Sequence, residues 1–164
     1  MIKNYINKKM IVLAIVLIGI LSLVPVVSAA STVPDNWIQM NMGGYSFSIP
    51  DGWKNGGIQE NPEYGYDSYI ANRDKSTMSV TIFNTESAYE EDYSYYKQRA
   101  GKSPVDIIPT EDVKGHEVKQ INFKNTIGNH AVMYYFEVQG KHFSLMYPNY
   151  SVYEDPLKII ETFY

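Results

Sequence analysis

Short runs of alternating apolar and polar residues recur between residues 45 and 147. In residues 45–49 tyrosine, phenylalanine and isoleucine alternate with serine, and in residues 78–82 methionine, valine and isoleucine alternate with serine and threonine. A period of two residues is typical of a strand with one buried face. Residues 117–123, 131–138 and 141–147 predict three more strands.

Two tight turns join neighbouring strands in this pattern. Residues 73–76 predict a turn between strands at 68–72 and 77–83. Gln139-Gly140 is a two-residue connection that predicts a hairpin pairing Val138 with Lys141. That register gives the hairpin two largely apolar faces, so we expect cover on both faces of the sheet.

Two stretches have the spacing of helices. The run from Ser87 to Glu90 matches a capping box, tyrosine recurs at helical spacing after it, and Gly101 ends the pattern. Near the C-terminus Asp155 suits an N-cap and Pro156 the first helical position. The apolar stripe of this last helix is predicted to consist of Leu157, Ile160 and Phe163.

These elements predict an α+β fold. We expect an antiparallel sheet of five to seven strands with helices packed on its faces, in a single domain over residues 31–164. A chain of this length is able to bury a core without disulfide bonds, and it contains no cysteine.

The first 30 residues predict an export segment. Lys3, Lys8 and Lys9 precede an apolar run, Pro25 breaks it, and small residues around Ala29 and Ala30 offer a cleavage site. The sequence favours a cleaved signal peptide over an uncleaved membrane anchor at residues 10–30. Both alternatives place residues 31–164 outside the cytoplasm, released or tethered to the membrane.

The net charge of residues 31–164 limits the classes of partner that we expect. Without the three leader lysines, 11 basic residues face 18 acidic ones, a net charge of −7. Nucleic acids and anionic lipids attract basic surfaces, so neither is an expected partner. The same segment has 14 tyrosines, a residue suited to half-buried sheets and to contact surfaces.

The order of these elements resembles the PsbP-like family. The residues that carry the likeness are "FSIPDGW" near the start of the domain, the mid-chain helix, the late glycine-turn hairpin and "PLKIIETF" at the end. The resemblance implies an α/β/α sandwich of the kind shared with Mog-type Ran-binding proteins. It also implies a non-catalytic role in docking onto larger protein assemblies, and it carries no implication of photosystem binding.

The glycine-rich corner from Phe47 to Gly57 raises the question of an anion-binding loop. Phosphate-binding glycines lead into a helix N-terminus, and no helical pattern starts at Gly57. Pro50-Asp51-Gly52 instead has the chemistry of a turn. We therefore interpret the corner as structural, with Trp53 folded back over the edge of the core.

Catalytic and metal-binding motifs are missing from the sequence. His142 is predicted to lie opposite Glu137 in the hairpin, away from His130, so the histidines do not predict a zinc site. No nucleophile elbow, zinc-protease motif or calcium loop is present. The acidic run at Glu86 and residues 90–92 is interpreted as stabilising a helix dipole. No catalytic residue, metal or cofactor is predicted, and the protein is not expected to be an enzyme.

Aromatic residues gather in the irregular segment from Gln59 to Arg73. Tyr64, Tyr66 and Tyr69 share this segment with Pro62 and Gly65. Exposed loop aromatics are common contact residues, so we predict that these tyrosines and Trp53 border a recognition surface. The competing interpretation is that one or two of them pack into the core beside Trp53.

The functional hypotheses follow from these features. The first is an exported, non-catalytic domain that docks onto another envelope or secreted protein. The second is a module that binds a small ligand or glycan at the same aromatic segment. A weaker third is a carboxylate-dependent hydrolase. Asn149 opens an N-glycosylation sequence, Asn-Tyr-Ser, which matters only in hosts with that machinery.

Overall fold

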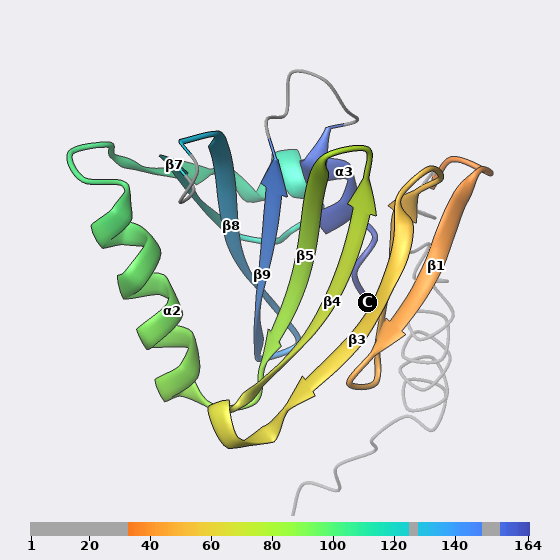
Figure 1. The fold of residues 1–164 in the computed structure, drawn as a ribbon, viewed down its shortest axis with the longest axis horizontal. Helices are drawn as coiled ribbons and strands as arrows, with labels where there is room; N and C mark the ends of the chain where they lie inside the picture. Colours follow the sequence, from red (N-terminus) through yellow and green to blue (C-terminus); the bar gives the residue numbers. More distant parts are fainter. Residues whose placement is uncertain (1–32, 125–127, 149–154) are drawn as a thin grey trace, which may run out of the picture. The chain divides into compact units, whose positions relative to one another are not determined.

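Nine strands form two antiparallel sheets in the computed structural model, which describes residues 33–124, 128–148 and 155–164 (Figure 1). The larger sheet has seven strands in the order β3-β4-β5-β9-β8-β7-β6, and the smaller pairs β1 with β2. The strands are β1 (Trp37–Met42), β2 (Tyr45–Pro50), β3 (Lys54–Asn61), β4 (Tyr66–Arg73), β5 (Ser76–Phe83), β6 (Val105–Ile108), β7 (Val118–Lys124), β8 (His130–Val138) and β9 (Lys141–Pro148). The helices are η1 (Pro62–Tyr64), α2 (Glu86–Arg99), η2 (Thr110–Val113) and α3 (Pro156–Ile160).

The predicted α+β class, a sheet with helices packed on its faces, is wrong. The fold is nearly all antiparallel sheet. One face of the seven-stranded sheet carries α2, the one long helix of the described residues. The other face is covered mainly by the β1–β2 pair, with the five-residue α3 and Val113 of η2 beside it. Both faces of the large sheet are packed against other elements, as its apolar faces indicated, but on the second face that element is mainly the β1–β2 sheet.

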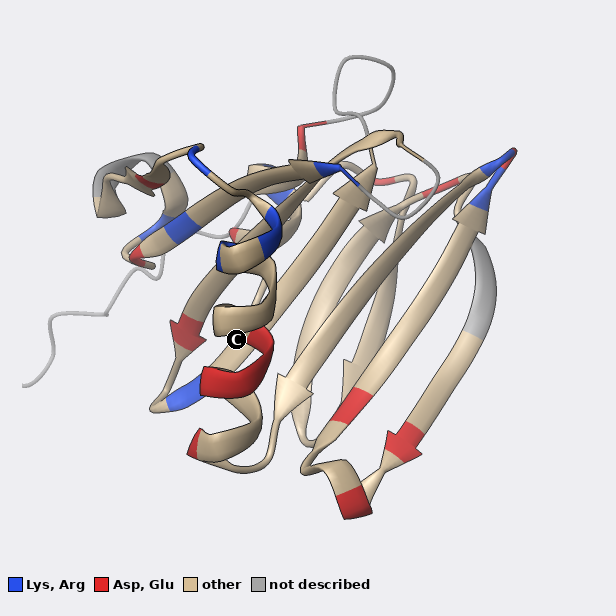
Figure 2. Cartoon of the chain, turned by 60° about the vertical axis from the view of Figure 1, so that its left-hand side comes forward, with Lys and Arg blue, Asp and Glu red and all other residues tan. Residues whose placement is uncertain are grey.

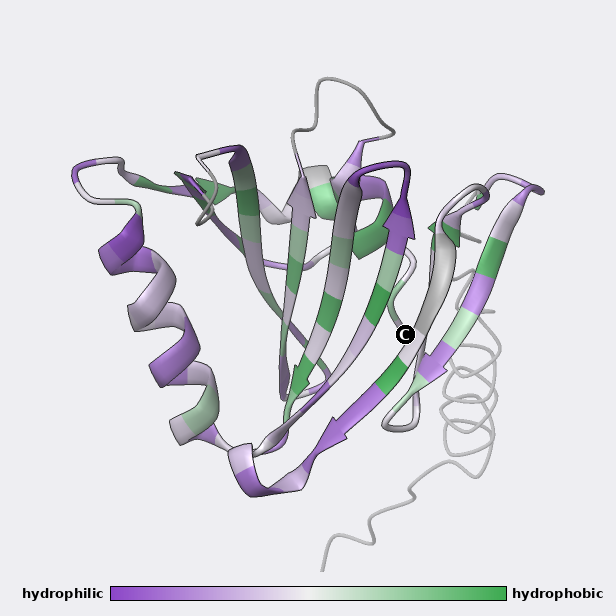
Figure 3. Cartoon of the chain, viewed as in Figure 1, coloured by the Kyte–Doolittle hydropathy of each residue, from purple (hydrophilic) through white to green (hydrophobic). Residues whose placement is uncertain are grey.

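The β8–β9 hairpin has the predicted register. Val138 pairs with Lys141, and Phe136 pairs with Phe143. Gln139 and Gly140 both adopt positive φ, 51° and 78°, the combination that a two-residue turn matching the twist of a hairpin requires. Alternation along β4, β5 and β9 sends every second side chain to each face. Figure 3 shows apolar residues as green bands along these strands.

The C-terminal residues close the core on the β1–β2 side. Ser46 and Tyr164 exchange backbone hydrogen bonds of 3.1 Å in both directions. The Ser48 amide donates to Thr162 Oγ1 at 2.8 Å. Phe163 stacks on Phe47 with ring centroids 4.8 Å apart. The chain end is thereby fixed to β2.

Residues 32–164 form one compact unit. Both hydrophobic clusters of the described residues are built entirely within it. A segment with its own core folds on its own, so residues 31–164 are a suitable piece for experiments.

Candidate functional site

The four aromatic residues predicted to border a recognition surface separate into two pairs. Trp53 and Tyr69 are buried, with 2% and 1% of their surface exposed, and both belong to the core on the β1–β2 side. Tyr64 is 64% exposed, and Tyr66 is half-buried. The second interpretation holds for Trp53 and Tyr69, so only Tyr64 and Tyr66 remain available for contact.

Tyr64 and Tyr66 lie where the chain passes from β3 to β4. Pro62 opens the short η1 helix, and Gly65 ends it in the left-handed conformation. The tyrosine rings lie side by side, with centroids 6.3 Å apart and a 32° angle between their planes. Pairing of Tyr66 with Phe83 brings this segment next to the end of β5.

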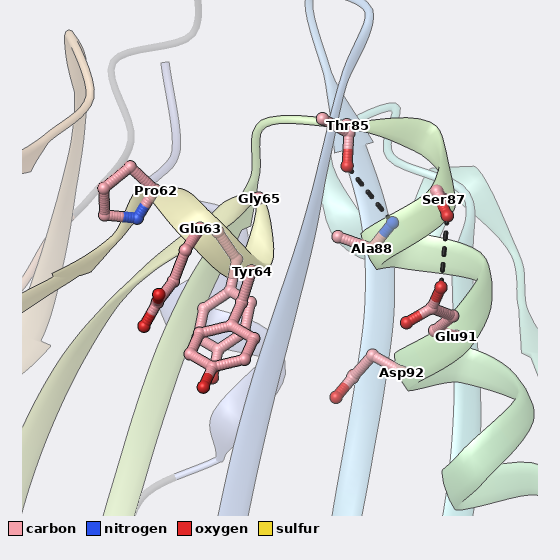
Figure 4. Close-up of a pocket in the computed structure, with 10 residues that line it drawn as sticks. Pro62, Glu63, Tyr64, Gly65, Thr85, Ser87, Ala88, Glu91 and Asp92 are labelled. Carbon is pink, nitrogen blue, oxygen red and sulfur yellow. Dashed lines mark hydrogen bonds between the residues drawn. The ribbon is translucent and has the colours of Figure 1, made fainter.

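A cleft of about 520 Å³ separates η1 from the start of α2. We call it the Tyr64 cleft. Figure 4 shows Glu91 and Asp92 projecting from α2 toward Tyr64, which lies on the opposite wall. Its lining residues are Pro62, Glu63, Tyr64, Gly65, Tyr66, Thr85, Ser87, Ala88, Glu91 and Asp92.

Thr85 fixes the α2 wall of the cleft. Its Oγ1 accepts a hydrogen bond from the Ala88 amide at 3.2 Å and caps the helix. The expected capping box at Ser87 is wrong by two residues. Ser87 instead donates to Glu91 Oε1 at 3.2 Å. This bond holds the Glu91 carboxylate on the cleft side of the helix.

Asp92 is the half-buried carboxylate of the cleft. The Tyr135 hydroxyl donates to its Oδ2 at 2.8 Å. Burial raises the Asp92 pKa above the ordinary value of 3.8, while the bond from Tyr135 lowers it. Burial also raises the Tyr135 pKa. Burial therefore disfavours the charged form of Asp92, so ionisation of this carboxylate in the folded protein costs free energy.

The acidic run of α2 exceeds what the helix dipole explains. Glu86 alone of these acids lies in the first turn, and the dipole acts mainly within that turn. Glu91 and Asp92 come later and line the cleft. Figure 2 shows acidic residues on the first half of α2 and around η1, with basic residues toward the other end of α2. The dipole interpretation thus fits the position of Glu86 and does not account for Glu90, Glu91 and Asp92.

A second, smaller cleft of about 340 Å³ lies on the β7 side of α2. His142 sits there with its ring stacked on Tyr89, centroids 4.1 Å apart. It lies opposite Glu137, as predicted, but its Nε2 contacts Glu86 Oε2 at 3.0 Å. Lys119 donates to the Tyr89 hydroxyl at 3.4 Å. Acidic and basic groups are mixed in this cleft, unlike in the Tyr64 cleft.

Metal and membrane features were sought in the described residues. Within that part of the chain, no three histidine, aspartate or glutamate side chains gather closely enough to hold a metal ion. None of the helices in that part of the chain has the length and apolar character needed to cross a bilayer. The predicted export segment at residues 1–30 and the predicted glycosylation site at Asn149 lie outside the described residues.

The chain was compared with protein-family models and with curated proteins. No protein-family model matches it. No curated protein matches it significantly. The PsbP-like resemblance thus remains a hypothesis based on the residues quoted above.

Gly65 is expected to tolerate no side chain, because the two walls of the cleft meet there. Its φ is +72°, and an added Cβ would lie 2.6 Å from Thr85 Oγ1 and 3.3 Å from the Ala88 Cβ. Gly65→Ala should lower the free energy of unfolding by about 1–3 kcal/mol through backbone strain alone, and further through this collision. Urea denaturation measures the loss.

Gly101→Ala is the matched control. Gly101 also has positive φ, +63°, but an added Cβ would meet open space. The Gly65 variant should therefore lose more stability than the Gly101 variant. Equal losses would show that the walls of the cleft are not in tight contact at Gly65.

Proposed function

We propose that this chain is an exported, non-catalytic docking domain that binds another envelope or secreted protein through the Tyr64 cleft. The observation that carries the proposal is the exposed Tyr64 ring, which lies beside that of Tyr66 on one wall of a cleft of about 520 Å³. Tyrosine is enriched among the residues that dominate protein interfaces, because its ring buries a large area at a small cost in conformational entropy.

Three further features support docking. The leader at residues 1–30 favours placement outside the cytoplasm. The PsbP-like resemblance implies docking as the common role of the family. The cleft lies between the capped start of α2 and the η1 segment, which the pairing of Tyr66 with Phe83 fixes to the end of β5, so its walls are held in place before a partner arrives.

Replacing both Tyr64 and Tyr66 by alanine is expected to abolish partner capture. Loss of a tyrosine that acts as an interface hot spot costs about 2 kcal/mol or more, a weakening of about 30-fold. The measurement is capture of proteins from crosslinked host envelope by residues 31–164, read by mass spectrometry. Circular dichroism should show that the variant remains folded, because the two rings lie outside the fully buried core.

Tyr95→Ala is the matched control. Tyr95 is 49% exposed on α2 and does not line the cleft, so its loss should leave capture unchanged. Equal capture by the wild type and the cleft variant would overturn the docking proposal. Capture of no protein, together with a thermal shift caused by a glycan or small molecule and lost in the cleft variant, would favour the second hypothesis.

A further inference from the structure

The charged residues that line the Tyr64 cleft are all acidic. Glu63, Glu91 and Asp92 line it, and no lysine or arginine is among its lining residues. Within the described part of the chain, none of the three carboxylates forms an ion pair. The Glu91 carboxylate accepts a bond from Ser87, and the Asp92 carboxylate accepts one from Tyr135. A carboxylate has room for more donors than one.

Asp92 makes this arrangement costly for folding. It is half-buried, and the polar partner it has is a neutral hydroxyl. Partly desolvated carboxylates are more stable beside a cation. The described residues supply no such cation. A cation of a partner could therefore form an ion pair with the Asp92 carboxylate that the folded chain itself does not form.

The aromatic wall suits the same cation. Tyrosine faces attract ammonium and guanidinium groups through the ring quadrupole. Tyr64 presents its ring across the cleft from Asp92 (Figure 4). Long basic side chains also bury their apolar stems on such rings while the charged head reaches polar groups. A cleft of about 520 Å³ is ample for one such side chain.

We propose that the Tyr64 cleft binds a basic segment of the protein partner, with a lysine or arginine head between Tyr64 and the carboxylates of Glu91 and Asp92. This inference rests on the proposed docking function and adds the chemistry of the partner. The net charge of −7 on residues 31–164 favours approach of such a segment.

The test uses small probes of known charge. Residues 31–164, labelled with ¹⁵N, are titrated with the capped pentapeptide Gly-Arg-Ser-Arg-Gly and followed by amide chemical shifts. The matched probes carry glutamate or glutamine in place of arginine. We expect shifts confined to residues 62–66 and 85–92 with the arginine peptide, no such shifts with the other two, and weaker binding as salt is added. Absence of these shifts at about 10 mM peptide, well above the dissociation constant of a weak contact of about 1 mM, would overturn the inference.

Charge-removing variants locate the contact. Glu91→Gln and Asp92→Asn should each weaken the arginine peptide about threefold, the effect of losing one solvent-accessible ion pair. Glu90 is the matched control, because it is an exposed acid on the same helix but outside the cleft. Glu90→Gln should leave the affinity within about 1.5-fold at physiological salt. Equal weakening by all three variants would show that the peptide responds to the overall negative charge of the helix and not to a specific site.

Asp92→Asn should change stability and binding in opposite directions. Burial raises the pKa of Asp92 in the folded protein above 3.8. Between 3.8 and the raised value the folded protein holds more protons than the unfolded chain, so its stability falls as pH rises through this window. The variant should therefore be more stable than the wild type at pH 7, and equally stable below pH 3.8. A variant that is less stable at pH 7 would contradict the unpaired state of this carboxylate.

Failure of this inference is distinguishable from failure of the docking function. If capture from host envelope is lost with the tyrosine variant but kept with Glu91→Gln and Asp92→Asn, the cleft docks a partner that is not basic. If none of these variants alters capture, both proposals are wrong.

Discussion

Replacement of Phe163 by alanine is expected to lower the free energy of unfolding by about 3–5 kcal/mol, the usual loss for a buried phenylalanine. Phe163 is 5% exposed. Its ring lies 4.8 Å from that of Phe47, 4.9 Å from Phe136 and 5.2 Å from Phe143, measured between centroids. It thus joins the small sheet to the centre of the large one, and its truncation would leave a cavity in a close-packed core.

Urea denaturation of residues 31–164 measures this loss, with Tyr164→Ala as the control. Tyr164 is the next residue, is 64% exposed and accepts a hydrogen bond from Gln39 Nε2 at its hydroxyl. Its removal should change stability by no more than about 0.5 kcal/mol. If Phe163→Ala lost no more stability than Tyr164→Ala, the Phe163 side chain would not contribute to the core.

Trp53→Ala is expected to have an effect of the same size, about 3–5 kcal/mol. Trp53 is 2% exposed, and its ring centroid lies 5.6 Å from that of Tyr147 in the core on the β1–β2 side. The residue was predicted to fold over the edge of the core and also to border the recognition surface. Its burial supports the first role, so the variant should lose stability and, where still folded, retain binding of the arginine peptide.

Tyr64→Ala provides the reciprocal result. Its exposed ring contributes little to folding, so its loss should change stability by about 0.5 kcal/mol or less while reducing peptide binding. Denaturation and peptide titration of the two variants are compared side by side. If Trp53→Ala weakened the peptide as strongly as Tyr64→Ala in a folded protein, Trp53 would belong to the binding surface after all.

The parts of the fold predicted from the sequence are those set by local turn chemistry. Gln139-Gly140 determines the β8–β9 register because both residues reach positive φ. The turn expected at residues 73–76 joins β4 to β5, with Arg73 paired to Ser76. Alternation then gives the buried face of each strand without knowledge of its neighbours.

The fold class was mispredicted because the element that packs on each face of the sheet is set by tertiary contacts. An apolar face in residues 131–147 shows that something must pack on it, but not whether a helix or a sheet does so. Nothing in the sequence of residues 37–42 indicates that they pair with residues 45–50 in a separate sheet over the larger one. Such layering depends on contacts between residues far apart in sequence.

The sequence predicted one wall of the cleft and not the other. Tyr64 and Tyr66 were found from their loop composition, whereas Glu91 and Asp92 were assigned to the helix dipole. The signal for joining them was the predicted β4–β5 turn: extending its register pairs Tyr66 with Phe83, which places residues 62–65 beside the start of α2. The amide of Asn84 donates to the Gly65 carbonyl at 2.7 Å across this junction. The start of the helix, one residue before Ser87, then places the two acids beyond its first turn.

Site-specific photocrosslinking tests the docking claim most directly. A photoreactive phenylalanine analogue replaces Tyr64 in one full-length variant and Tyr95 in another, each produced in the host and irradiated in living cells. Our account predicts one protein adduct from position 64 that has a basic segment at the crosslinked site, and no such adduct from position 95. No adduct at position 64, or the same adducts at both positions, would contradict it.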